Sequence, residues 1–207
     1  MREKEKTTTV IFVRHGQADF PHDRLYCDER EDPPLTPEGL LQAQRAAALL
    51  EGQTVDLIYS SPMLRTRATA EQIAARCGTQ VIFDPKLKER PFGIWDGLFF
   101  DEIAREYPEQ FQSWKKDPVS FVPEGGEPIH AHMERVKSAL QQVIDAHRGQ
   151  RIVVVSHVGP IRMCLTDALQ MPLTSYRRLT IDYASVSRVD YGSRQNNLVY
   201  MNISGKI

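Results

Sequence analysis

The sequence predicts an α/β protein with three layers, α/β/α, in which helices cover both faces of a mostly parallel sheet. Two stretches, Thr7–Val13 and Ile152–Val155, contain only apolar or β-branched residues and lack the polar alternation of a half-exposed strand. Segments with the apolar spacing of amphipathic helices alternate with these and with shorter strand-like stretches. Because strands of this kind must be buried on both faces, the alternation favours a parallel sheet covered on both sides.

Length and composition limit the classes of protein that the chain can represent. Its 207 residues suit one domain over 1–207, with 41% hydrophobic and 26% charged residues and a net charge of -1. This charge predicts binding to neither nucleic acid nor a membrane. The three cysteines, Cys27, Cys77 and Cys164, fit reduced thiols, and the first residues resemble neither a signal peptide nor a membrane span. We therefore expect a cytoplasmic protein.

A helix is predicted after the first strand and a polar loop over residues 20–34. Thr36 is expected to cap this helix and Pro37 to be its first residue, because both types favour these positions. The helix should end near Leu50 and bury one face. That face is expected to contain Leu40, Ala43, Ala47 and Leu50.

The second strand is predicted over Asp56–Ser60, again followed directly by a helix. Ser61 is expected to cap this helix and Pro62 to start it. Arg65 would then lie about one turn into the helix. Since helix N-termini at the carboxyl end of a parallel strand attract anions, an arginine there predicts an anion site.

The middle of the chain is predicted to leave the sheet and return to it. A short strand, Val81–Phe83, leads to a turn-rich segment, and residues 92–127 are rich in aromatic residues and proline. We expect one short helix around Asp101–Trp114 within this excursion. Because the connection is long, it is expected to form a partial lid over one edge of the sheet.

The last third is predicted to contain two helices around the second apolar strand and then two or three further strands in residues 180–203. The last pair of strands would be joined around residues 192–196. The apolar face of the first helix is marked by Ile129, Met133, Val136, Leu140 and Val143. The second helix is expected to bury Ile161, Leu165 and Leu169.

Both apolar strands end in a histidine that a glycine follows closely, at His15 and at His157. Ligands of open α/β sheets bind at the carboxyl ends of the strands. If the two strands are neighbours, both imidazoles project into the same crevice. Arg14 and Arg65 can reach it as well, and Glu89 lies in another turn that could approach it.

Two histidines, two arginines and one carboxylate suit phosphoryl transfer without a metal or another cofactor. Guanidinium groups match phosphate oxygens with two hydrogen bonds and stabilise the charge of the group in transfer. A neutral imidazole is a competent nucleophile at phosphorus. A carboxyl group can protonate the departing alkoxide and then deprotonate the attacking water.

These residues lie in segments that resemble, in order, the motifs of the histidine phosphatase superfamily, also called the phosphoglycerate mutase-like family. The first is the Arg-His-Gly-Gln signature at residues 14–17. The further segments cover residues 32–43, 60–70, 87–97, 126–127 and 156–162. The chain departs from the family pattern at Pro21, Pro128 and Val158, none of which removes a catalytic group.

The resemblance implies a phosphoglycerate mutase-like fold and a role for each matching residue. His15 would be the phosphorylated nucleophile and Glu89 the proton donor. The phosphate is expected to be bound by Arg14, Gly16, Gln17, Arg65 and His157. A Cβ at Gly16 would crowd the backbone against the phosphate. Arg24 and Arg90 are candidate contacts for an anionic substrate.

Several other polar or aromatic residues are expected to have no part in the chemistry. His130 and His132 lie two residues apart on a predicted helix, with no cysteine or carboxylate partner at ligand spacing, so a solvated helix face is expected instead of a metal site. Trp95 and Trp114 are expected to pack rather than to stack on bases, since no basic groove accompanies them.

We therefore expect a phosphomonoesterase that acts on a small phosphorylated metabolite through a phosphohistidine. One alternative is a phosphoglycerate mutase, although those enzymes have a longer lid than the roughly thirty residues available here. Another is a member directed to a phosphoprotein, as enzyme or as binding module. Within the phosphatases, residues 32–43 are similar to the α-ribazole phosphatases. A homodimer is possible on such folds.

Overall fold

The computed structural model describes residues 7–21, 24–25 and 31–205. The strands are β1 (Thr8–Arg14), β2 (Leu57–Ser60), β3 (Val81–Phe83), β4 (Arg151–Ser156), β5 (Val186–Tyr191) and β6 (Asn196–Ile203). The helices are α1 (Pro37–Leu49), α2 (Leu64–Cys77), α3 (Phe100–Glu106), α4 (Pro108–Lys116), α5 (Ile129–Ala146) and α6 (Val158–Ala168). Three short 3₁₀ helices cover Pro85–Leu87, Gly93–Trp95 and Leu173–Arg178.

The six strands form one sheet in the order β3-β2-β4-β1-β5-β6. The pairs β3–β2, β2–β4 and β4–β1 are parallel, and β5 and β6 extend the sheet antiparallel to β1. The predicted mostly parallel α/β sheet is therefore confirmed. The two apolar stretches are direct neighbours, with Val13 opposite Val155 and Arg14 opposite Ser156. Their carboxyl ends thus lie side by side.

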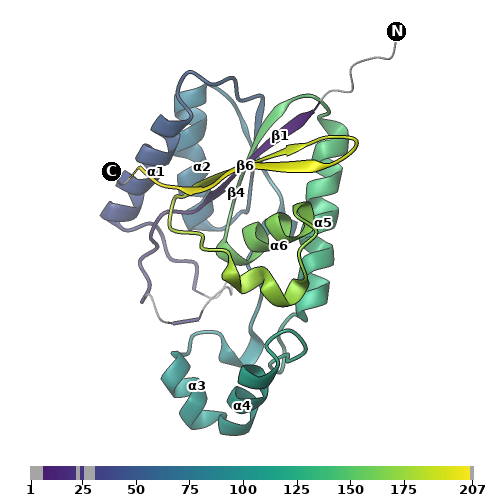
Figure 1. The fold of residues 1–207 in the computed structure, drawn as a ribbon. Coiled ribbons are helices and arrows are strands. Elements are labelled where there is room, and N and C mark those ends of the chain that lie inside the picture. Colours follow the sequence, from purple (N-terminus) through teal and green to yellow (C-terminus); the bar gives the residue numbers. More distant parts are fainter. Residues whose placement is uncertain (1–6, 22–23, 26–30, 206–207) are drawn as a thin grey trace.

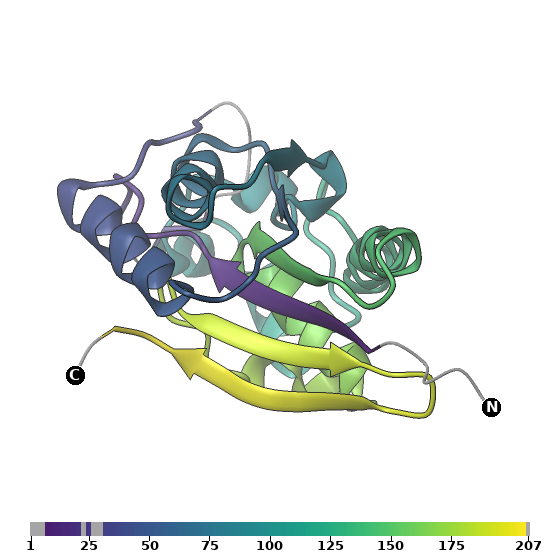
Figure 2. The ribbon, with the colours of Figure 1, turned by 90° about the horizontal axis from the view of Figure 1, so that it is seen from above.

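Helices cover both faces of the sheet, as Figure 2 shows from above. Successive residues of β1 point to opposite faces. Ile11 and Val13 pack in the core under α1 and α2. Val10 and Phe12 pack in the core under α5 and α6. The absence of polar alternation in β1 is explained, because both of its faces are interior.

Helix α1 begins as predicted and buries Ala43, Ala47 and Leu50 as expected, but Gly39 takes the place of Leu40 on the buried face. The Thr36 side chain accepts a hydrogen bond of 2.9 Å from the Gly39 N–H, and Pro37 is the first helical residue. Leu40, which was expected inside, is 39% exposed. Gly39 faces the interior instead, since a Cβ there would lie 2.0 Å from the Gln17 carbonyl oxygen. This backbone contact determines how α1 is rotated on the sheet.

The start of α2 differs from the prediction. The helix begins at Leu64, and neither Ser61 nor Pro62 forms part of it. The carboxylate of Asp32 accepts the Leu64 N–H at 2.9 and 3.0 Å, which supplies the oxygen that a capping serine would have offered. Arg65 is consequently in the first turn, close to the carboxyl end of β2.

The excursion over residues 92–127 contains two helices, α3 and α4, where one was expected. The chain breaks at Tyr107 because Pro108 follows it, and the residue before a proline disfavours the helical conformation. Figure 1 shows both helices projecting from the carboxyl ends of the parallel strands. Ring centroids are 5.0 Å apart for Trp95 and Phe121 and 5.6 Å for Phe100 and Trp114. The expected packing role of the two tryptophans is confirmed.

The last third largely follows the prediction. Residues 180–203 contain two strands, β5 and β6, joined by residues 192–195. Leu169, expected inside, is 36% exposed because α6 ends before it. Cys77 and Cys164 are free thiols, and Cys27 lies outside the described residues. None of the helices in the described ranges is long and apolar enough to cross a membrane.

Candidate active site

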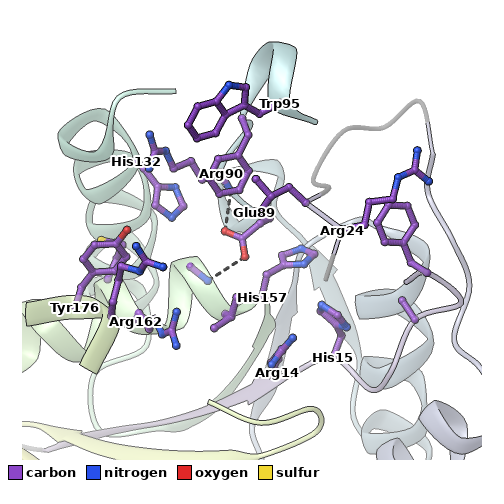
Figure 3. Close-up of a pocket in the computed structure, with 18 of the residues that line it drawn as sticks. Arg14, His15, Arg24, Glu89, Arg90, Trp95, His132, His157, Arg162 and Tyr176 are labelled. Carbon is purple, nitrogen blue, oxygen red and sulfur yellow. Dashed lines mark hydrogen bonds between the residues drawn. The ribbon is translucent and has the colours of Figure 1, made fainter. Parts of the chain in front are cut away.

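The ends of β1 and β4 bring His15 and His157 together. The His15 N–H donates to the Ser156 carbonyl at 3.0 Å, which continues the parallel pairing one residue beyond β1. The two imidazole centroids are 5.1 Å apart, edge to face. Both rings line a cavity of about 280 Å³, together with Arg14 and Glu89 (Figure 3). Arg65 lines the same cavity. All five predicted catalytic side chains therefore meet in one place.

The hydrogen bond of His15 determines which ring nitrogen carries the proton. Nδ1 lies 2.7 Å from the Gly16 carbonyl oxygen, which can only accept, so Nδ1 is the protonated nitrogen. Nε2 then keeps a lone pair. Burial, followed by the positive charges of Arg65 and Arg14, lowers the pKa of His15 well below the usual histidine value. His15 is thus a neutral base near pH 7, with Nε2 available to react.

His157 is almost completely buried and is held by the segment after β2. Its Nε2 lies 2.9 Å from the Ser61 hydroxyl, so Ser61, the residue predicted to cap α2, positions a histidine instead. Its Nδ1 is buried and has no hydrogen-bond partner in the described part of the chain. Burial and then Arg65 lower the pKa of His157 well below the usual histidine value. The ring is therefore neutral, and one nitrogen remains for a ligand.

Two arginines place positive charge beside these rings. Arg14 donates from Nη1 to the Ile181 carbonyl at 2.7 Å, and its guanidinium lies 3.9 Å from the ring centroid of Tyr183. Burial lowers the pKa of Arg14, and Tyr183 and Glu89 oppose that effect. Arg65 is 1% exposed, with Nη1 3.5 Å from the Asp32 carboxylate. A buried and a half-buried guanidinium group beside neutral imidazoles make a pocket suited to a doubly charged phosphate.

Glu89 is positioned by two backbone N–H groups. Its Oε1 accepts from the Arg90 N–H at 2.8 Å and its Oε2 from the Gly159 N–H, in the first turn of α6, at 2.9 Å (Figure 3). A Cβ at Gly159 would lie 2.0 Å from Oε1. Only glycine at this position therefore leaves room for the carboxylate.

The structure places Gly16 and Gln17 outside the cavity wall. The Gly16 N–H donates to the Thr69 hydroxyl at 3.1 Å, and a Cβ at Gly16 would lie 2.2 Å from the Gly39 carbonyl oxygen. Glycine is thus required at position 16 because the backbone of α1 lies too close for a Cβ. The Gln17 carbonyl accepts from the Thr36 N–H at 2.9 Å, so this residue joins the strand end to α1. Neither Gly16 nor Gln17 lines the cavity.

Arg24 and Arg90 do line the cavity, farther from His15 (Figure 3). Arg24 donates from Nε to the Gly97 carbonyl and lies 3.5 Å from the Glu31 carboxylate. Arg90 is buried and donates from Nε to the Glu127 carbonyl at 2.7 Å. Backbone carbonyls therefore hold both guanidinium groups at the wall.

The cavity wall also contains residues that were not among the sequence-based candidates, and Arg162, Tyr183 and His132 are three of them. Arg162 donates from Nε to the Leu179 carbonyl at 2.8 Å, and burial lowers its pKa. Tyr183 lies against Arg14, and nothing in its local sequence indicates this contact. His132, expected on a solvated helix face, is completely buried. Its position three residues after Ile129 and four before Val136, both on the buried face of α5, was a usable signal.

A metal site would need several histidine, cysteine, aspartate or glutamate side chains close together. Within the described ranges, no three or more histidine, cysteine, aspartate or glutamate side chains are grouped so that they could hold a metal ion.

Comparisons with known proteins agree with this geometry. The family model of the histidine phosphatase superfamily (branch 1) matches residues 10–204. Phosphoserine phosphatase 1 from Hydrogenobacter thermophilus is 33% identical over 195 residues, which cover 94% of this chain and 92% of that protein. A protein named probable phosphoglycerate mutase GpmB, from Cronobacter sakazakii, is 33% identical over 186 residues, 88% and 84% of the two chains. The solved alpha-ribazole phosphatase from Shigella flexneri superposes with a TM-score of 0.85 at 27% identity, covering 94% of this chain and 96% of that one.

Proposed function

The chain belongs to the histidine phosphatase superfamily (branch 1), and from this premise we propose that it hydrolyses a small phosphomonoester through a phosphohistidine on His15. It is a phosphomonoesterase of that family. One observation carries the intermediate: the Gly16 carbonyl accepts the Nδ1 proton of His15 at 2.7 Å, which leaves a lone pair on Nε2 at the cavity wall. The low pKa of His15, caused by burial and by Arg65 and Arg14, keeps this nitrogen unprotonated.

In the first half-reaction, Nε2 of His15 attacks phosphorus while the bond from phosphorus to the ester oxygen breaks. Arg14 and Arg65 bind the oxygens of the transferring group and stabilise its charge. His157 donates a further hydrogen bond from the nitrogen that no protein group occupies. Glu89 in its acid form protonates the departing alkoxide. The products of this step are the free alcohol and a phosphohistidine.

In the second half-reaction, water attacks the phosphorus of the phosphohistidine as the N–P bond breaks. Glu89, now a carboxylate, accepts a proton from that water and returns to its acid form. Its two backbone hydrogen bonds hold the carboxylate in one place for both steps. Inorganic phosphate leaves and His15 regains its lone pair.

The cavity supports a metabolite-sized substrate. Its volume of about 280 Å³ is at the small end of the range for small-molecule sites. We propose that residues 92–127 act as a partial lid, because Trp95, Phe100 and Trp114 from this excursion line the cavity. The relatives that are named phosphoserine phosphatase and alpha-ribazole phosphatase support this class of substrate.

The test is phosphate release from a panel of phosphomonoesters in the presence of a chelator. The panel contains p-nitrophenyl phosphate, phosphoserine, 3-phosphoglycerate, sugar phosphates, nucleotides and α-ribazole phosphate, each assayed with wild type and His15→Ala. We expect turnover that survives the chelator and is lost in the variant. Turnover that persists in purified His15→Ala would refute the phosphohistidine route, and turnover that the chelator abolishes would refute the metal-free mechanism.

A mutase is the second candidate, because one 33% identical relative is named for phosphoglycerate mutase. Such an enzyme returns the phosphoryl group from His15 to a second hydroxyl of the substrate. Incubation of 3-phosphoglycerate with catalytic bisphosphoglycerate distinguishes the two. Formation of 2-phosphoglycerate faster than free phosphate would favour the mutase, and the reverse would favour hydrolysis.

A further inference from the structure

The wall of the cavity carries more positive charge than the reaction described above uses. Among the described residues that line it, six are arginines and one, Glu89, is acidic, although the whole chain has a net charge of -1. Arg14 and Arg65 are assigned to the transferring phosphate. The other four are Arg24, Arg90, Arg162 and Arg177. A cavity of this charge favours a ligand with more negative charge than one phosphate group.

Arg24 and Arg90 already have partners in the protein. Arg24 lies 3.5 Å from the carboxylate of Glu31, which balances part of its charge. Arg90 is buried, and its Nε donates to a backbone carbonyl at 2.7 Å. Arg162 and Arg177 differ, because no ion pair in the described part of the chain includes either of them. The charges of these two arginines are thus available to a ligand.

Arg162 is anchored at one end of its guanidinium group and open at the other. Its Nε donates to the Leu179 carbonyl at 2.8 Å, which orients the plane of the group. The side chain is half-buried in the cavity wall, and within the described ranges neither Nη1 nor Nη2 has a hydrogen-bond partner. Two parallel N–H groups in a fixed plane match the two oxygens of a carboxylate.

Arg162 lies on the side of the cavity where the alcohol leaves. It is three residues after Gly159 on α6, so the two residues are neighbours on one face of the helix. The Gly159 N–H holds Oε2 of Glu89, the group that protonates the departing oxygen. Burial lowers the pKa of Arg162, and the charge of Glu89 opposes this most strongly, which places the two groups near each other. A substrate group that reaches Arg162 therefore belongs to the alcohol.

The 3₁₀ helix after α6 adds two side chains to this part of the wall. Tyr176 and Arg177 both line the cavity, and Tyr176 raises and Arg177 lowers the pKa of Arg162, so both lie close to it. The guanidinium of Arg177 is 4.9 Å from the ring centroid of Trp114 in the 92–127 excursion. Figure 3 shows Tyr176 and Arg162 on one side of the cavity. Two neighbouring arginines without an acidic partner repel each other, and an anion between them would replace this repulsion by two attractions.

We infer that Arg162 and Arg177 form a subsite for a carboxylate on the leaving alcohol, so that the substrate is the phosphate ester of a small hydroxy acid. The inference rests on the proposed phosphatase function and adds the class of alcohol. The carboxylate accepts hydrogen bonds from Nη1 and Nη2 of Arg162, and Arg177 adds a second positive charge. Because Glu89 already offsets part of the charge of Arg162, a single negative charge suits the subsite better than a second phosphate.

Two pairs of substrates test the contribution of the carboxylate alone. 3-Phosphoglycerate has a carboxylate where glycerol 3-phosphate has a hydroxymethyl group, and phosphoserine has one where phosphoethanolamine has a hydrogen. The quantity measured is the ratio of the two kcat/KM values within each pair, for wild type, Arg162→Gln, Arg177→Gln and Arg178→Gln. Arg178 is the matched control, since it is exposed beside Arg177 and does not line the cavity.

We expect wild type to favour the carboxylated member of a pair by about tenfold or more. Arg162→Gln should lower this ratio about 10- to 100-fold, because a charge-assisted hydrogen bond is lost. Arg177→Gln should lower it less, since Arg177 is exposed, and Arg178→Gln should keep the wild-type ratio. The lost charge also acts on Glu89, but that effect is common to both substrates and cancels in the ratio. The ratio is also independent of the fraction of the protein that is folded.

Four outcomes would overturn the inference. They are a wild-type preference for the uncarboxylated esters, an unchanged ratio in Arg162→Gln, an equal loss with both members of a pair, and faster hydrolysis of 2,3-bisphosphoglycerate than of 3-phosphoglycerate. The third would assign Arg162 to the transferring phosphate, and the fourth would show that the subsite takes a phosphate. Failure of the phosphatase proposal itself would be visible separately, as activity that survives His15→Ala.

Discussion

Replacing Gly159 with alanine should disable the proton donor without unfolding the protein. The new Cβ would lie 2.0 Å from Oε1 and 3.0 Å from Cδ of Glu89, whereas real Cβ atoms essentially never approach closer than 3.0 Å. The carboxylate must therefore retreat by about 1 Å, and a misplacement of that size costs about 10²-fold in rate. Gly159 is in the first turn of α6, where alanine is a better helix former than glycine by up to about 1 kcal/mol. We expect unchanged or higher stability with strongly reduced activity.

The assay is kcat/KM for an alkyl phosphomonoester and for p-nitrophenyl phosphate, together with the thermal midpoint of unfolding. The alkyl ester should lose about 10²-fold and p-nitrophenyl phosphate much less, because only the alkoxide needs the acid of Glu89. In a double-mutant cycle, Gly159→Ala should add little to Glu89→Gln if both act on one group. A folded Gly159→Ala with wild-type activity toward the alkyl ester would refute the placement of Glu89.

Further predictions concern the groups around the phosphate pocket. Ser61→Ala removes the hydroxyl 2.9 Å from Nε2 of His157; it should lower the free energy of unfolding in urea by about 1–3 kcal/mol, and an unchanged value would contradict this contact. Arg65→Lys should lower kcat/KM about 10- to 100-fold because a lysine cannot bind two phosphate oxygens as a planar fork; activity equal to wild type would exclude a direct phosphate contact. Burial and then Arg65 lower the pKa of both His15 and His157 in the folded protein. As the pH falls, the two histidines therefore bind protons at a higher pH in the unfolded chain than in the folded protein. The free energy of unfolding should thus be highest above about pH 6.5 and decrease below it, by up to about 1.4 kcal/mol per pH unit for each histidine. His157→Asn should show a shallower decrease, and an identical slope would contradict the assignment.

The main features of the fold could be predicted because they depend on patterns that are local in sequence. The uninterrupted apolar character of β1 and β4 reflects burial on both faces, and adjacent parallel strands bring their carboxyl ends to one edge. His15 and His157, the residues that follow these strands, therefore had to lie close together. The same argument located Arg14, and the order of the motifs located Arg65 and Glu89.

Features that depend on contacts between distant segments could not be predicted in the same way. The burial of Gly39 in place of Leu40 follows from its close contact with the backbone of Gln17, and the start of α2 follows from Asp32, thirty-two residues before Leu64. Helical spacing alone cannot distinguish a buried glycine from an exposed one. Helical spacing did place His132 on the same face of α5 as its buried neighbours. The usual preference of histidine for the surface outweighed that signal.

The measurement that tests the central claim most directly is the trapping of phosphate on His15. Glu89→Gln should still be phosphorylated by p-nitrophenyl phosphate, since that leaving group needs no acid, but the hydrolysis step would lack its base. The account predicts that the phosphoenzyme accumulates and that tandem mass spectrometry under alkaline conditions finds the phosphate on the imidazole of His15. Two results would contradict it. One is phosphate on another residue, and the other is steady turnover of Glu89→Gln that forms no phosphoenzyme and is unchanged in the double variant with His15→Ala.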